Sequence, residues 1–446
     1  MPAAATALVG LMNDSWLDDL PEAVLRISAA DDTPLTRGVV ARRSGGGDHE
    51  RTGGGRGTVV SRTRVLAPAW SVAAPRASAV GASHRVECEA AGASIAFESD
   101  THPLAPSAEA FAGLMLVPAL EQGRRVEVDA ALDPVWLDGT RRLTSIVAAW
   151  WGFPDTYPLE HRGTAVPAAT RRAETAACFT GGVDSFYTLL FGSHHVDHLM
   201  FVLGYDMTRD DTVRYQAFER SMLEVGRRTG RGVIRLRSDA REHAVFGAAK
   251  WDRTHGAALA AAGHLLADSI GTLVIPSSFR ADRLVPWGSH PDIDRLWSTQ
   301  RVAIVHDDHS VGREDKTARI VHDPIVWDHL RVCWENRVPT GNCSRCQKCV
   351  RTMISIETHG RRDDVTVFDR VTPMVELIDD LPSIPDRLII PWRNLLELDL
   401  EPATRRALVR LLRRSGPGVV AGVSRKVRRI ARRAPGRTRG TSGGDQ

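Results

Sequence analysis

Four of the six cysteines in this 446-residue chain are gathered in one short stretch. Cys343, Cys346 and Cys349 follow one another at intervals of three residues, and Cys333 lies ten residues before this triplet. Four thiolates at such spacing are typical of a closed tetrahedral Zn²⁺ site, which leaves no open position for catalysis. An iron–sulfur cluster could use the same thiols, and the spacing does not decide between the two. Clustering also indicates metal binding in a reducing compartment rather than a secreted disulfide framework.

A glycine-rich turn after a short apolar run is the second group of residues with chemical potential. It consists of Thr180, Gly181, Gly182, Val183, Asp184 and Ser185. Two glycines permit a tight turn that exposes backbone N–H groups, and the N-terminus of a following helix adds partial positive charge. With its two hydroxyl groups, the turn suits a pyrophosphate. No Gly-Lys-Ser/Thr follows, so it is not a Walker A loop. The alternative is an ordinary strand–turn–helix in which Asp184 only caps the helix.

The elements that must position these residues alternate between strands and helices. Short apolar runs predict strands at Thr175–Phe179, His198–Leu203, Val233–Leu236, Thr272–Pro276 and Val302–Val305. Helices are expected between them at Asp184–Phe191, Asp211–Arg228 and His255–Ile270. This alternation predicts an α/β fold with a doubly wound parallel sheet. Ligands of such sheets lie beyond the carboxyl ends of the strands, where the glycine turn is found.

The turn and the cysteines together resemble the PP-loop ATP pyrophosphatase superfamily, and within it the QueC-like 7-cyano-7-deazaguanine synthases of queuosine biosynthesis. Thr180 stands where the family loop, Ser-Gly-Gly-x-Asp-Ser, usually has serine. Cys333-Trp334-Glu335 is similar to the family's Cys-Tyr-Glu step, and the later three cysteines match its closing triplet. The resemblance covers residues 175–360. It implies a PP-loop domain, similar to the adenine nucleotide alpha hydrolases, with a Cys₄ zinc site.

The resemblance also implies a reaction. The family cleaves ATP between the α and β phosphates, adenylates a carboxylate and lets an amine or ammonia displace AMP, giving an amide that members convert to a nitrile. ATP, Mg²⁺ and Zn²⁺ are the implied cofactors. Residues 180–185 would bind ATP, Asp184 and Lys316 would be catalytic, and His290, Asp292 and Arg313 would contact substrate. A solvated helix face is the alternative for Lys316, and the acid, the nucleophile and the final product stay open.

The regions outside 175–360 have no counterpart in that family. Residues 1–165 are expected to form a small α+β domain of unassigned role, with strands at Gly57–Val65 and Ser83–Glu89 and a helix at Thr140–Trp151. Residues 361–414 are expected to form a helical extension. Residues 415–446, rich in Arg, Gly, Ser and Pro, are expected to be a disordered basic tail.

Charge is divided unevenly along the chain. From Ala403 onward there are thirteen Lys and Arg and one acidic residue, a net charge of +12, so the remainder carries −8. Such a tail raises a non-catalytic alternative, nucleic-acid binding, which its lack of aromatic residues and the acidic body disfavour. A further alternative is RNA thiolation, although metal-bound thiols oppose it. We expect a cytoplasmic protein without a membrane span or signal peptide, and a homodimer is left open.

Overall fold

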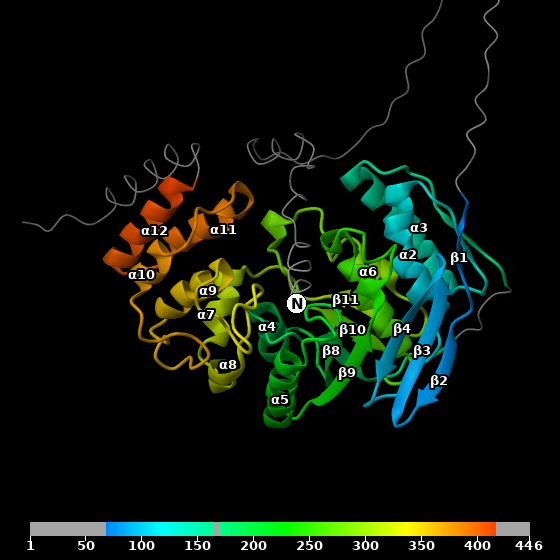
Figure 1. Ribbon diagram of the computed structural model, residues 1–446, viewed down its shortest axis with the longest axis horizontal. Helices are drawn as coiled ribbons and strands as arrows, with labels where there is room; N and C mark the ends of the chain where they lie inside the picture. The colour runs from blue at the N-terminus through cyan, green and yellow to red at the C-terminus, as the bar shows by residue number, and fades with distance from the viewer. Residues whose placement is uncertain (1–67, 164–168, 416–446) are drawn as a thin grey trace, which may run out of the picture. The chain divides into compact units, whose positions relative to one another are not determined.

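The structure is a computed structural model that describes residues 68–163 and 169–415 (Figure 1). The described residues from Ala69 onward belong to one compact unit. The strand expected at Gly57–Val65 and, apart from Ser415, the expected basic tail lie outside the described residues. Within the described ranges, no helix combines the length and the apolar character needed to cross a membrane.

Eleven strands form one mixed sheet in which six of the ten neighbouring pairs are parallel. Their order is β11-β10-β7-β8-β9-β4-β3-β1-β5-β6, with β2 beside β3. The protein therefore has an α/β fold with a large, mostly parallel sheet.

Five neighbouring parallel strands form the half of the sheet that carries the glycine turn. They are β7 (Thr175–Cys178), β8 (His198–Leu203), β9 (Gly232–Ser238), β10 (Thr272–Ile275) and β11 (Ala303–His306), close to the ranges expected from sequence. Along this half of the sheet the order is β9-β8-β7-β10-β11. β8 and β9 lie on one side of β7, whereas β10 and β11 lie on its other side. The position between β7 and β10 is therefore the switch point of a doubly wound arrangement.

The other half of the sheet, formed by residues before 165, contains both parallel and antiparallel pairs. Its strands are β1 (Trp70–Val72), β2 (Arg76–Val80), β3 (Ser83–Ala90), β4 (Ala93–Ser99), β5 (Val126–Val128) and β6 (Leu159–His161). The β3–β4 pair is antiparallel because the two residues between them, Ala91 and Gly92, have φ of 49° and 84°, as a tight hairpin requires. β4 then pairs antiparallel with β9, with Phe97 opposite Ser238. One sheet therefore runs through both regions expected from sequence.

Helices cover both faces of this sheet, and strand residues alternate between the two cores. Leu273 and Ile275 of β10 belong to the first core, with α2 (Ala108–Gln122), α3 (Pro134–Trp151) and α6 (Trp251–Leu265). Val274 belongs to the second, with α4 (Val183–Phe191), α5 (Thr212–Thr229), α7 (Arg313–Ile320), α8 (Pro324–His329) and α9 (Gln347–Glu357). α6 ends earlier than the expected Ile270, because the Leu266 N–H turns back to the Gly263 carbonyl at 3.1 Å.

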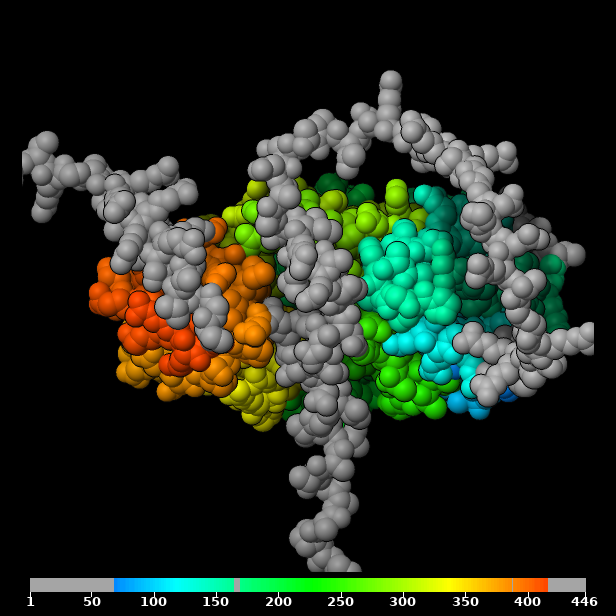
Figure 2. Space-filling model, turned by 90° about the horizontal axis from the view of Figure 1, so that it is seen from above, coloured from blue at the N-terminus to red at the C-terminus, as the bar shows by residue number. Residues whose placement is uncertain are grey.

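The C-terminal extension is helical and packs on the second core. It contains α10 (Met374–Asp379), η5 (Asp386–Leu388), α11 (Ile389–Asn394), η6 (Leu395–Glu397) and α12 (Pro402–Arg414). Before the extension, the chain also forms short 3-10 turns at η2 (Ala240–Glu242), η3 (Ala281–Arg283) and η4 (Asp294–Trp297). Leu408 and Leu411 of α12 are fully buried, while Arg405 and Arg414 bind backbone carbonyl groups of the extension. The yellow-to-red part of the chain accordingly lies against the green part in Figure 2.

Candidate functional site

The glycine turn follows β7 at the switch point of the sheet. Gly181 has φ of 72°, a conformation that favours glycine, and Gly182 is the N-cap of α4 with φ of −79°. The Ser185 hydroxyl donates to the Gly182 carbonyl at 3.0 Å. From behind, the Arg331 backbone N–H donates to the Gly181 carbonyl at 2.7 Å. The turn is therefore held in shape by its own serine and by the segment that leads to the cysteines.

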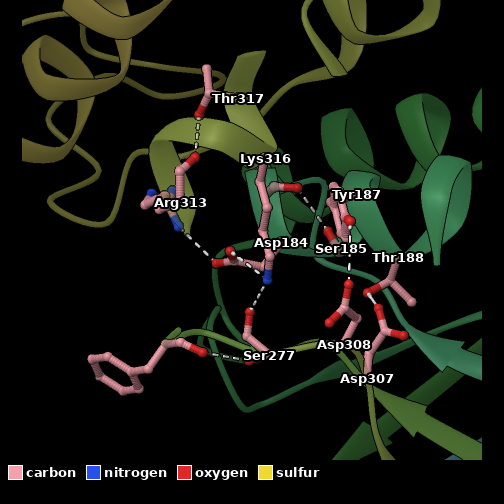
Figure 3. A network of polar contacts seen from close by, with 12 residues as sticks. Asp184, Ser185, Tyr187, Thr188, Ser277, Asp307, Asp308, Arg313, Lys316 and Thr317 are labelled. Carbon is pink, nitrogen blue, oxygen red and sulfur yellow. Dashed lines mark hydrogen bonds and ion pairs between the residues drawn. The ribbon is translucent and has the colours of Figure 1, made fainter. Parts of the chain in front are cut away.

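Asp184 is not the helix cap, because Gly182 occupies that position and no side chain caps α4. Its carboxylate instead meets two cations of α7 (Figure 3). Arg313 Nη1 lies 2.7 Å from Asp184 Oδ2, and Lys316 Nζ lies 3.7 Å from Asp184 Oδ1. Two of the residues expected to act with the turn, Lys316 and Arg313, are thus brought to it from more than a hundred positions away in sequence.

Lys316 does not lie on a solvated helix face. Its side chain is only 2 % exposed, and Nζ donates to the Ser277 carbonyl at 2.6 Å. The ammonium also lies 5.3 Å from the centre of the Tyr187 ring, which stabilises a cation. Burial lowers the pKa of Lys316, and the nearby Asp184 carboxylate opposes that shift. A lysine desolvated and oriented in this way is typical of a site that receives an anion.

Two further carboxylates that the sequence analysis did not single out follow β11. Asp307 is buried and accepts a hydrogen bond of 2.5 Å from the Thr188 hydroxyl of α4. Asp308 accepts from the Tyr187 hydroxyl at 3.5 Å, and hydrogen bonds with Ser310 lower the pKa of Asp308. The signal available in the sequence was a pair of acids directly after an apolar strand. These contacts fix α4, and with it the turn, to the end of β11.

Three more cations interact with the turn or with the charged groups beside it. Lys348 and Arg351 of α9 feel the charges of Arg313 and Asp184, and burial, followed by Arg313, lowers the pKa of Lys348 to about 8 and that of Arg351 to about 10. Arg331, whose backbone binds Gly181, has its pKa lowered by burial as well. Several cations that repel one another in a desolvated place favour binding of a polyanion. None of these three was singled out from sequence, although Lys348 is one of only four lysines.

The four clustered cysteines meet in space and could hold zinc. Their sulfur atoms all lie within 4.8 Å of one another, and the Cys333–Cys346 and Cys343–Cys349 pairs are each separated by 4.0 Å. Zn–S bonds of about 2.3 Å in a tetrahedron place sulfur atoms about 3.8 Å apart. The Cys346 N–H also donates to Cys343 Sγ at 3.3 Å.

The four thiols strongly affect one another's protonation. Hydrogen bonds from Cys346 and then Cys349 lower the pKa of Cys333, so one thiolate is readily accommodated. The contact with Cys333 raises the pKa of Cys346 to about 12, and contacts with Cys333 and then Cys346 raise the pKa of Cys349. Four thiolates can coexist here only with a cation among them. All four side chains are buried.

Asn342 connects the two parts of the cysteine cluster, a role that sequence reasoning missed. Its side-chain oxygen accepts from the backbone N–H groups of Val332 and Cys333 at 2.8 and 3.0 Å, and its amide donates to the Leu330 carbonyl at 2.7 Å. The adjoining Arg331 is the residue that holds Gly181. The cysteine cluster therefore stabilises the segment that supports the glycine turn.

His290 and Asp292, the other residues expected to contact substrate, lie on the loop before η4, and the His290 N–H donates to Asp294. His290 is buried with its ring 4.8 Å from that of Trp150, and Asp292 is largely exposed and pairs with it at 3.5 Å. Among the described residues, no hydrogen bond or ion pair joins either of them to the turn. Burial lowers the pKa of His290.

Comparisons of the chain with protein-family models, with curated proteins and with solved structures found no match.

Proposed function

We propose that this protein is an ATP-dependent ligase that adenylates a carboxylate, releases pyrophosphate and joins the acyl group to an amine or ammonia. The observation that carries this proposal is the set of charges around the glycine turn. The turn lies at the switch point of the sheet, its Asp184 pairs with Arg313 and Lys316, and Lys348 and Arg351 feel the charge of Asp184. This set of charges suits ATP, whose β and γ phosphates leave together as pyrophosphate.

Each group has a role in this proposal. The N–H groups of residues 181–185 bind the phosphates, and the four cations stabilise the charge that develops on the departing pyrophosphate. Asp184 orients Arg313 and Lys316 and would hold Mg²⁺, which neutralises phosphate charge when bound. Zinc at the four cysteines has a structural role, because a closed Cys₄ site offers no position for substrate.

The product follows from the resemblance to the 7-cyano-7-deazaguanine synthases. The acid that corresponds to their nitrile is 7-carboxy-7-deazaguanine, so this compound is the first substrate to try. The experiment measures AMP and pyrophosphate by mass spectrometry across a panel of carboxylates, each with ATP and ammonium. Acid-dependent release of both products supports the ligase. If no acid in the panel leads to ATP cleavage and the protein binds RNA tightly at physiological salt, the nucleic-acid-binding alternative replaces the ligase.

RNA thiolation is less well supported. That chemistry needs a cysteine that is available as a thiolate to carry sulfur. Cys178, at the end of β7 beside the turn, is buried, and burial raises the pKa of its thiol. The four other cysteines near the site are those that could hold zinc.

A further inference from the structure

A histidine and an aspartate meet at the end of β11, on the opposite face of the sheet from Asp307. β11 pairs with β10 through Ile275 and His306, and β10 pairs with β7 through Val274 and Ala177. His306 therefore lies in the same row as Cys178, the last residue of β7, which precedes the glycine turn by two positions. Because neighbouring strands lie about 4.8 Å apart, the two backbones are separated by about 10 Å. An imidazole at this position can reach toward a nucleotide bound at the turn.

Asp294 of η4 fixes the orientation of this imidazole. Its fully buried carboxylate lies 2.7 Å from His306 Nδ1. The Ser289 hydroxyl donates to the same oxygen at 2.7 Å, and the His290 N–H donates to the other oxygen at 3.2 Å. As an acceptor from all three groups, Asp294 places the imidazole proton on Nδ1.

The other ring nitrogen, Nε2, is therefore an acceptor. The His306 side chain is 7 % exposed, and Nε2 is buried with no hydrogen-bond partner among the described residues. A buried acceptor without a partner destabilises the fold and calls for a reason. Anchoring the 289–294 loop does not supply that reason, because Ser289 and the His290 N–H already bind Asp294.

We propose that His306 is the general base for the second half-reaction, with Asp294 as its positioning residue. This assignment rests on the proposed ligase function. His306 Nε2 accepts a proton from the amine as its nitrogen forms the C–N bond to the acyl-adenylate carbon. The C–O bond to AMP breaks, and AMP leaves with the electron pair. The imidazolium is stabilised by Asp294 and returns its proton to water.

Other titratable groups face this pair and belong to any pH analysis. The His309 ring lies 6.0 Å from that of His306, and His290 and Asp292 lie on the loop before η4. Cys178 on β7, two strands away from β11, and His255 on α6 both feel the charge of Asp294.

His306→Asn is the informative variant, because its amide keeps the donor to Asp294 and removes the basic Nε2. The assay uses ATP, ammonium and 7-carboxy-7-deazaguanine, or the panel acid that gives most pyrophosphate if this one gives none. We expect pyrophosphate–ATP exchange to stay within about twofold of wild type, and product formation with ammonia to fall about 10²-fold. After attack, the hydroxylamine nitrogen is far more acidic than that of ammonia and loses its proton to water, so hydroxylamine should give hydroxamate at a near wild-type rate. Asp294→Asn should lower ammonia-dependent turnover and shift its pH profile, and His309→Asn is the matched control expected to behave as wild type.

Each other result overturns the assignment in a distinct way. Undiminished amide formation by His306→Asn would show that His306 is not the general base. Joint loss of exchange and hydroxamate formation gives His306 a structural role or a role in adenylation. If the wild-type protein shows no pyrophosphate–ATP exchange with any acid, both the ligase function and the assignment of His306 as its base are refuted.

Discussion

Lys316 is the clearest instance of a residue whose surroundings describe its task. A buried ammonium is strongly destabilising unless it is paired and hydrogen-bonded. Here the pairing is incomplete, since the Asp184 oxygen lies at 3.7 Å, beyond hydrogen-bonding distance, and Arg313 takes the closer contact. The ammonium is therefore held in place and can still bind an incoming phosphate oxygen.

Gly182 allows a sharp test of phosphate binding by the turn. Its φ of −79° suits any residue, and an added Cβ would lie 3.4 Å from its nearest neighbour, Thr180 Oγ1. Gly182→Ala should fold with a nearly unchanged melting temperature. We expect acid-dependent pyrophosphate release to fall about 10²-fold, because the methyl group blocks close approach of phosphate to the N–H groups.

The matched control for that substitution is Gly113→Ala in α2, where the added Cβ has a similar clearance of 3.5 Å but lies in the opposite core. Its activity should equal that of wild type. Normal turnover by Gly182→Ala would mean that the turn is only structural.

Lys348 predicts a pH dependence of nucleotide binding. With its pKa lowered to about 8, Lys348 is charged at pH 7 and loses its proton as the pH rises through 8. The phosphates bind the charged form, so ATP affinity should decrease from pH 8 to pH 9.5, with proton uptake on binding. Isothermal titration calorimetry in buffers of different ionisation enthalpy measures both. Lys348→Arg, which stays charged, should flatten this dependence, and an equal slope in that variant would exclude Lys348 as its source.

At the scale of elements, α9 joins the two chemical features of the molecule. Cys346 is its N-cap residue, and the cations Lys348 and Arg351 lie in its first two turns. Asn342 and Arg331 link the same cysteines to the glycine turn. The cysteine cluster therefore helps to position α9 and the glycine turn, which carry groups of the proposed phosphate site.

Metal content and nucleotide binding should consequently change together. The purified protein should contain about one zinc per chain. Asn342→Ala removes four hydrogen bonds and should lower zinc affinity roughly 10- to 100-fold, with weaker ATP binding at limiting zinc that excess zinc restores. Elemental analysis and ATP titrations measure these changes. Cys88→Ser, a buried cysteine of β3 outside the cluster, is the control that keeps both, and iron with sulfide in the purified protein would contradict the zinc assignment.

The sequence predicted elements well where a local pattern determines them. Each parallel strand is a short apolar run between turn residues, and the cysteine spacing alone placed the metal cluster. It did not predict partners that depend on distant chain segments. The residues around Asp307 do not indicate that Thr188 is its hydrogen-bond donor, and those around Gly181 do not indicate that the Arg331 N–H binds its carbonyl. The contacts of His290 with Trp150 and with Asp294 could not be predicted for the same reason.

At the scale of the whole molecule, positive charge is concentrated at the C-terminal end, yet part of it is used internally. Arg405 and Arg414 of α12 bind carbonyl groups, and Arg410 pairs with Asp379 at 2.5 Å. Ser415 belongs to the fold too, since its hydroxyl accepts from the Ile384 N–H at 2.8 Å. A truncation that spares the fold therefore begins at residue 416.

Deleting residues 416–446 should leave pyrophosphate release unchanged, because every residue of the proposed site precedes Gly360. Any salt-sensitive binding to RNA should weaken, because eight Lys and Arg are removed. Turnover assays and RNA titrations at two salt concentrations test both expectations. Loss of turnover at an unchanged melting temperature would place the tail in the active site.

The antiparallel pairing of β4 with β9 has a consequence for anyone who dissects this protein. A fragment beginning near Thr175 would contain all the proposed catalytic groups, yet it would leave β9 without its neighbour from Phe97 to Ser99. The bare backbone groups of such an edge strand recruit other chains, so the fragment should aggregate rather than work as a minimal enzyme. The first half of the sheet thus protects β9 from becoming an exposed edge strand that would pair with other chains.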